Sequence, residues 1–112
     1  MTLYHFTCTH AERKIGRAGG VLRPFPHALA PVPLVWMTDL AEPDADRLGL
    51  TNVIITCDRT EVRYRIPHPD RVIPWIEWAD ERGVDAAARF ALELDHDPLT
   101  WFVSERPQRT RR

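Results

Sequence analysis

The sequence has no long apolar run, little charge imbalance and few cysteines. No apolar stretch approaches the roughly 20 residues needed to span a bilayer, and the first residues lack the basic and apolar regions of a signal peptide. The formal net charge of −1 gives no global reason to expect nucleic-acid binding. We therefore expect a cytoplasmic protein with no membrane partner.

The two cysteines, Cys8 and Cys57, can form at most one disulfide, and a reducing compartment argues against it. They also make a poor metal site. Cys8 and His10 lie closer in sequence than the usual zinc spacing of two to four intervening residues, and there is no second cysteine pair. A Cys8 nucleophile has no readable activating arrangement either. We expect no metal and no thiol chemistry.

What the sequence does have is enough apolar content for one ordinary core. Its 112 residues, 44% of them hydrophobic, fit a single domain with no repeats and no low-complexity tract. We expect this domain to cover residues 1–106 and the basic residues 107–112 to form a frayed tail. The fold class predicted from the order of elements is α+β, with a small, mainly antiparallel split sheet and flanking helices.

Side-chain periodicity predicts the individual elements. The predicted strands span residues 3–7, 34–38, 52–57, 61–66 and 100–104, and the predicted helices span residues 10–18, 43–48, 74–82 and 86–94. Ala87, Phe90, Ala91 and Leu94 follow helical spacing, which predicts that they form the buried face of the last helix. Four prolines within residues 21–33 predict an ordered, extended loop of the kind that often binds ligands.

The first strand has two polar side chains on one face. In Leu3–Thr7, period-2 alternation puts His5 and Thr7 side by side. A capping box at Thr9 and Glu12 then opens a helix that ends at a pair of glycines. A second short strand follows and contains Trp36.

This order of elements resembles the ADP-ribosyltransferase-like fold, in which an "H-x-T" strand holds the ribose of NAD. The resemblance implies that His5 donates a hydrogen bond to a ribose hydroxyl and that the backbone of Phe6 holds the nicotinamide amide, with Thr7 beside them. Trp36 would stack on the nicotinamide ring, and Thr38 would lie where the strand ends at the site.

The same resemblance implies an anion contact and a catalytic carboxylate. Arg23 follows the glycine pair and is the candidate contact to the NAD pyrophosphate, with Arg13 or Arg17 as alternatives. Cleavage of the nicotinamide–ribose bond develops positive charge on the ribose, which a carboxylate can stabilise. The family usually has Glu near residues 99–100, where this chain has none. Glu105 is therefore the first candidate and Asp97 the second.

The expected activity is transfer of ADP-ribose from NAD to an unknown acceptor, which could be a protein, a nucleic acid or a small molecule. Two alternatives share the fold. One is a catalytically inactive nucleotide-binding or protein-interaction module, which the missing family glutamate favours. The other is an RNA 2′-phosphotransferase-like enzyme, against which the balanced charge and short chain count.

Overall fold

The computed structural model describes residues 1–8, 13, 15–16, 19–48 and 59–111. The strands are β1 (Leu3–Thr7), β2 (Val21–Leu22), β3 (Val35–Thr38), β4 (Val62–Ile66), β5 (Ile73–Pro74), β6 (Trp101–Ser104) and β7 (Gln108–Arg109). The helices are α2 (Ala45–Leu48), α3 (Trp75–Arg82), α4 (Ala86–Glu93) and the 3-10 helix η1 (Pro98–Thr100). In these ranges no helix has the length and apolar character to cross a membrane.

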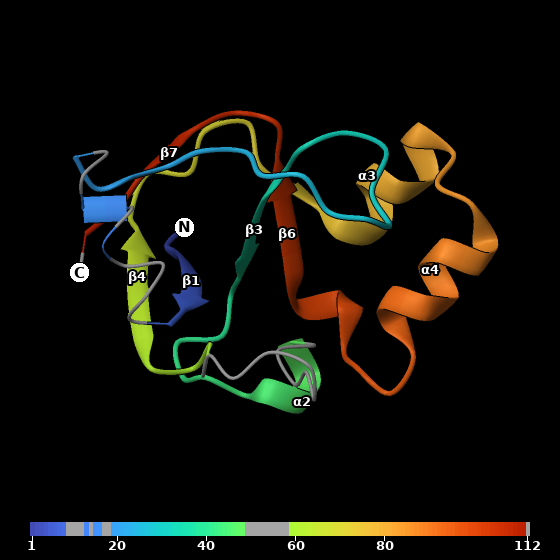
Figure 1. The fold of residues 1–112 in the computed structure, drawn as a ribbon, viewed down its shortest axis with the longest axis horizontal. Coiled ribbons are helices and arrows are strands. Elements are labelled where there is room, and N and C mark those ends of the chain that lie inside the picture. Colours follow the sequence, from blue (N-terminus) through green and yellow to red (C-terminus); the bar gives the residue numbers. More distant parts are fainter. Residues whose placement is uncertain (9–12, 14, 17–18, 49–58, 112) are drawn as a thin grey trace.

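Five strands form one antiparallel sheet in the order β4-β1-β3-β6-β5, and β2 pairs with β7 in a second, two-stranded sheet. Helices α3 and α4 lie at the β6 end of the molecule, whereas β4, β7 and the C-terminus lie at the other end (Figure 1). The α+β class with a mainly antiparallel sheet and flanking helices is thus confirmed.

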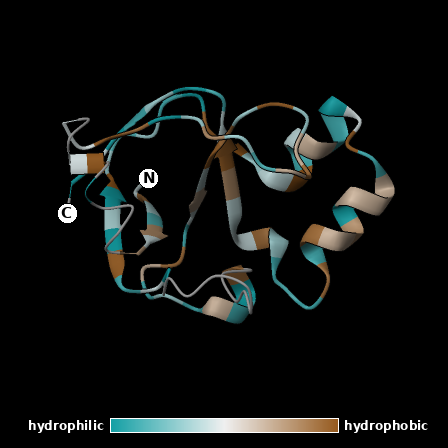
Figure 2. Cartoon of the chain, viewed as in Figure 1, coloured by the Kyte–Doolittle hydropathy of each residue, from teal (hydrophilic) through white to brown (hydrophobic). Residues whose placement is uncertain are grey.

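Each half of the sheet contributes to a separate apolar cluster. On one face, Trp101 and Val103 of β6 pack with Trp75, Trp78 and the neighbouring residues of α3. On the other face, residues of β1, β3 and β4 pack against Leu22. In Figure 2, β4 alternates between hydrophilic and hydrophobic residues along its length, as expected of a strand with one solvent-facing side.

Three glycines with positive φ lie directly after residue ranges predicted as helices. Gly83 has φ 62° and ψ 40° after α3, and its backbone N–H bonds a carbonyl of the last turn. Gly19 and Gly20 also have positive φ, and the Gly20 N–H donates to the Ile15 carbonyl at 3.0 Å. The helix predicted over residues 10–18 and the strand predicted over residues 52–57 otherwise lie outside the described residues.

The predicted buried face of α4 is wrong. Phe90 is 65% exposed and Leu94 is 50% exposed, so the apolar stripe faces outward. The inward side instead has Leu92, which packs against the apolar cluster, together with Arg89 and Glu93, which form an ion pair at 3.3 Å. The Glu93 carboxylate also accepts the indole N–H of Trp75 at 3.0 Å. The Glu93 carboxylate faces inward because the buried indole N–H of Trp75 needs a hydrogen-bond acceptor.

The segment predicted to fray, 107–112, is instead paired as far as residue 111. Gln108 of β7 is 1% exposed and lies opposite Leu22 of β2. Arg111 forms an antiparallel bridge with Arg65 of β4. Val21 and Leu22, predicted as part of a loop, are accordingly a strand. The tail is ordered because β2 and β4 both offer free strand edges.

The expectation of two reduced cysteines is also corrected. Cys8 follows β1, is 6% exposed and is disulfide-bonded. Cys57 lies outside the described residues.

Candidate functional site

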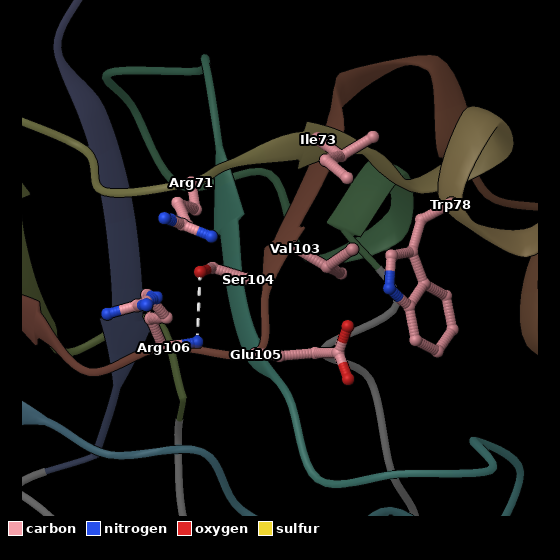
Figure 3. Close-up of a pocket in the computed structure, with 7 residues that line it drawn as sticks. All are labelled: Arg71, Ile73, Trp78, Val103, Ser104, Glu105 and Arg106. Atoms are coloured by element: carbon pink, nitrogen blue, oxygen red, sulfur yellow. Dashed lines mark hydrogen bonds between the residues drawn. The ribbon is translucent and has the colours of Figure 1, made fainter.

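A cavity of about 470 Å³ lies where β6 ends, between β5 and α3. This volume falls in the range of small-molecule sites. Its lining combines apolar side chains with charged ones, as Figure 3 shows. The residues are Arg71, Ile73, Trp78, Val103, Ser104, Glu105 and Arg106. One of them, Glu105, is the first candidate for the catalytic carboxylate.

Buried polar side chains hold two segments of this rim together. The Ser104 hydroxyl donates to the Asp70 carbonyl at 2.9 Å and accepts the Arg106 N–H at 3.0 Å. The Gln108 amide accepts the Asp70 N–H at 2.8 Å and donates to the Asp70 and Arg106 carbonyls at 2.8 and 3.1 Å. These bonds fix Arg71 and Arg106 at the same rim. Arg71 itself has a φ of 50°, an unusual value for a residue other than glycine.

The wall of the cavity contains an unsatisfied donor. Trp78 is 2% exposed, and its indole N–H finds no hydrogen-bond partner in the part of the chain that the structure describes. In Figure 3 the indole nitrogen is on the ring edge that faces Val103 and Glu105. A buried N–H without an acceptor costs about 1–3 kcal/mol, which an acceptor on a ligand would recover.

Glu105 is not an isolated carboxylate. It forms an ion pair with Arg82 of α3, and the Arg82 guanidinium also lies 5.6 Å from the centre of the Trp78 ring. Both partners are partly exposed, with side-chain exposures of 45% and 42%.

His5 lies on β1, away from this cavity. Its Nδ1 is 2.8 Å from the Trp36 carbonyl oxygen, and because a carbonyl only accepts, Nδ1 carries the proton and donates. Burial lowers the pKa of His5, and this backbone hydrogen bond partly opposes the effect. The neutral ring therefore keeps Nε2 as an acceptor. His5 lies opposite Tyr64 of β4, on the same face of the strand as the buried Thr7.

The side chains of His5 and Trp36 point to opposite faces of the sheet. Tyr4 pairs with Thr38, so these two share a face, and strand alternation puts Trp36 with them. His5, one residue from Tyr4, points to the other face, and Phe6 to the same face as Tyr4. The Trp36 ring lies 4.9 Å from Trp75 and 5.8 Å from His27, centroid to centroid, within the aromatic cluster. The two side chains thus do not line one cleft.

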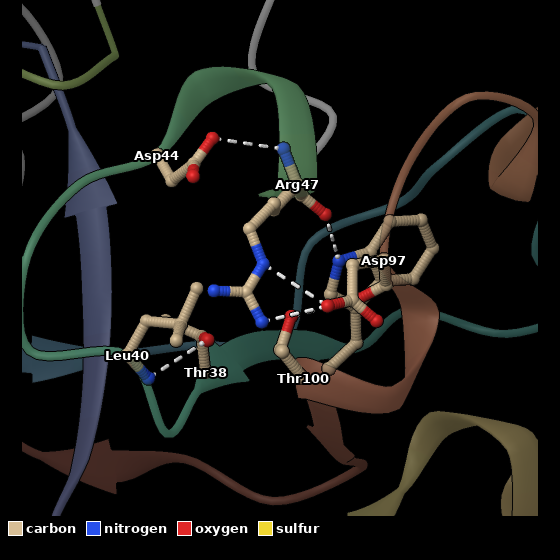
Figure 4. Close-up of polar contacts among 7 residues, drawn as sticks. Thr38, Leu40, Asp44, Arg47, Asp97 and Thr100 are labelled. Carbon is tan, nitrogen blue, oxygen red and sulfur yellow. Dashed lines mark hydrogen bonds and ion pairs between the residues drawn. The ribbon is translucent and has the colours of Figure 1, made fainter.

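The other predicted residues make structural contacts. The Thr38 hydroxyl accepts the Leu40 N–H at 3.1 Å, and Asp97 accepts two bonds from the Arg47 guanidinium at 3.0 and 2.7 Å (Figure 4). The Asp97 backbone also bonds Arg47, so this residue ties η1 to α2. Arg23 is exposed just after β2. None of the three lines the cavity at Glu105.

Arg71, Arg106 and Trp78 were missed by reasoning from the sequence. Arg106 was predicted as the last residue of the domain, and Trp78 lay within a predicted helix with no role assigned to it. The sequence did contain one indication of this site. In Ser104-Glu105-Arg106, a hydroxyl, a carboxylate and a guanidinium follow one another at the end of a predicted strand. Arg71 joins them only through the tertiary fold.

Within the described residues, no group of three His, Cys, Asp or Glu side chains could hold a metal ion.

Acidification is expected to destabilise the fold as the pH falls below about 6.5, the pKa of an unperturbed histidine. Burial lowers the pKa of His5, and burial together with the Arg59 charge lowers the pKa of His27. The unfolded chain then binds more protons than the folded one just below pH 6.5, so stability is full above that pH and is lost below it. Thermal unfolding from pH 7.5 to 5.5 measures the effect.

The matched variants are His5→Gln and His68→Gln. The first should reduce the pH dependence, whereas the second changes an exposed histidine and should leave it intact. An unchanged pH profile in His5→Gln would contradict the expected role of this partly buried imidazole.

No protein-family model matches the chain, and neither a curated protein nor a solved structure shows significant similarity to it.

Proposed function

We propose that the protein binds NAD in the cavity beside Glu105 and transfers its ADP-ribose to an acceptor, with release of nicotinamide. The observation that carries the proposal is the juxtaposition of Glu105 with Arg71, Arg106 and the unpaired indole N–H of Trp78 around one cavity. Two guanidinium groups suit the pyrophosphate of a dinucleotide, and the indole N–H offers a donor to an oxygen atom of the ligand.

The chemistry proposed for Glu105 follows from the charge that develops during cleavage. When the nicotinamide–ribose bond breaks, its electron pair leaves with nicotinamide and the ribose becomes cationic. The Glu105 carboxylate stabilises this cation, and an acceptor oxygen or nitrogen then attacks the anomeric carbon and passes its proton to the same carboxylate, which acts as the general base. The contacts predicted from the resemblance for His5, Phe6, Thr7, Trp36 and Thr38 belong to a different NAD position, because none of these residues lines the cavity at Glu105.

The test combines calorimetric NAD binding with chromatographic measurement of nicotinamide. Arg106→Ala is expected to weaken NAD binding by about tenfold, the scale of one lost charge-assisted hydrogen bond. Arg23→Ala is the matched control, since it removes another exposed arginine that does not line the cavity. If Arg23→Ala or His5→Ala weakens binding and Arg106→Ala does not, NAD binds elsewhere. If the wild-type protein does not bind NAD, the proposal fails.

A second candidate function is nucleotide binding without transfer. The specific observation in its favour is that both candidate carboxylates are already paired, Glu105 with Arg82 and Asp97 with Arg47. A carboxylate that already bonds a guanidinium is less available to a developing cation. NAD binding with no nicotinamide release above the rate without protein would select this second function.

A further inference from the structure

Aromatic and basic side chains lie in a row across the edge of the main sheet. Tyr4 of β1 is directly opposite Arg65 of β4, and Arg65 is directly opposite Arg111. Two backbone bonds of 2.6 and 2.7 Å join Arg65 to Arg111. Directly opposed residues point to the same face of a sheet, so these three side chains lie side by side.

A fourth residue extends this row into a surface. Arg63 is two residues from Arg65 on β4 and therefore shares its face, and its guanidinium lies 5.4 Å from the centre of the Tyr4 ring. All three arginines are exposed, and Tyr4 is partly exposed. We refer to Tyr4, Arg63, Arg65 and Arg111 as the basic sheet face.

The arrangement is unfavourable for the isolated protein. Like charges directly opposite each other on neighbouring strands destabilise a sheet, and Arg65 and Arg111 are such a pair. Among the described residues neither of them forms an ion pair. Arg63 is 4.0 Å from the exposed Glu42 carboxylate and donates a hydrogen bond to the Ala41 carbonyl at 2.8 Å. A bound polyanion would remove this repulsion.

In the part of the chain that the structure describes, an acidic region lies far from the basic sheet face. Residues 75–97 contain seven carboxylates and two arginines, and they form α3, α4 and the turn after them. In Figure 1 these helices lie at the opposite end of the molecule from β4 and the C-terminus. The balanced net charge of −1 thus conceals an acidic end and a basic end.

We infer that the basic sheet face binds single-stranded nucleic acid. Arginines spaced along a strand can contact successive phosphates, and the Tyr4 ring offers a surface on which an unpaired base can stack. A duplex keeps its bases stacked on one another, so it cannot use Tyr4 in this way. This surface is separate from the Glu105 cavity, and the inference does not depend on NAD binding.

The test is fluorescence anisotropy of the full chain with labelled oligouridylate and oligothymidylate of about 12 nucleotides, a length that fits known single-strand sites. Binding is expected at about 50 mM salt and should weaken as salt rises, with a slope of about −2 for three phosphate contacts. Arg65→Ala and Arg111→Ala should each make the slope shallower by about 0.7. Tyr4→Ala should weaken binding about tenfold, whereas Tyr4→Phe, which keeps the ring, should not.

Glu77→Gln is the matched charge control at the acidic end, and it should leave the affinity unchanged if binding is local to the basic sheet face. Binding of either oligonucleotide supports the inference, and a preference for one of them shows whether ribose or deoxyribose is favoured. If Tyr4→Ala does not fold, Arg111→Ala still tests the inference, because it changes an exposed residue near the end of the chain. Equal binding of duplex and single strand, no binding of either oligonucleotide, or wild-type affinity in both arginine variants would overturn it.

Discussion

Replacing Trp75 by alanine is expected to lower the free energy of unfolding by about 3–5 kcal/mol, the range for removing a large buried aromatic side chain. Trp75 is fully buried, and its ring centre lies 4.9 Å from that of Trp36 and 5.7 Å from that of Trp78. The variant also removes the indole donor to Glu93, which leaves that carboxylate without one of its partners. Urea unfolding followed by circular dichroism measures the loss.

Phe90→Ala is the matched control for this prediction. The sequence pattern assigns Phe90 to the buried face of its helix, but its ring is 65% exposed. Exposed substitutions usually change stability by no more than about 0.5 kcal/mol. Equal losses in Trp75→Ala and Phe90→Ala would mean that α4 is packed the other way round.

Glu105→Gln is expected to lower the turnover of NAD by about 10²-fold or more, the scale of a lost catalytic acid or base. The change removes the charge that would stabilise the cationic ribose and keeps the shape of the side chain. Because the proposed interaction strengthens only in the transition state, NAD affinity should stay nearly unchanged. Single-turnover measurement of nicotinamide release, with calorimetry for affinity, separates the two quantities.

Asp97→Asn is the control for Glu105→Gln. Asp97 accepts two bonds from Arg47, so its loss should affect stability more than turnover. Full activity in Glu105→Gln together with a large loss in a folded Asp97→Asn protein would transfer the catalytic role to Asp97. If neither variant changes a measurable activity, the mechanism proposed for the cavity is wrong.

The sequence by itself determined the elements whose signals are local. The strand Leu3–Thr7 and the helix ending at Gly83 were predicted correctly, because side-chain alternation and a left-handed glycine act over a few residues. The α+β class followed from the order of these elements. Of the residues proposed for a site, Glu105 is the one that lies on the cavity.

The tertiary structure alone decided which way α4 faces. An amphipathic pattern predicts that the apolar stripe is buried, but the helix turns Arg89 and Glu93 inward. They meet Asp80 and the indole N–H of Trp75, both on α3. Satisfying a buried donor from another element outweighed the burial of two apolar side chains, and nothing within residues 86–94 encodes that donor.

Long-range strand pairing decided the position of the C-terminal segment, and with it the cavity rim and the basic sheet face. The pairing of Gln108 with Leu22 and of Arg111 with Arg65 converts a tail with no apolar pattern into part of two sheets. That pairing fixes Arg106 at the rim of the cavity and aligns Arg111 with Tyr4 across β4. Composition and periodicity report only local preferences, whereas the register between distant strands depends on which edges the rest of the fold leaves open.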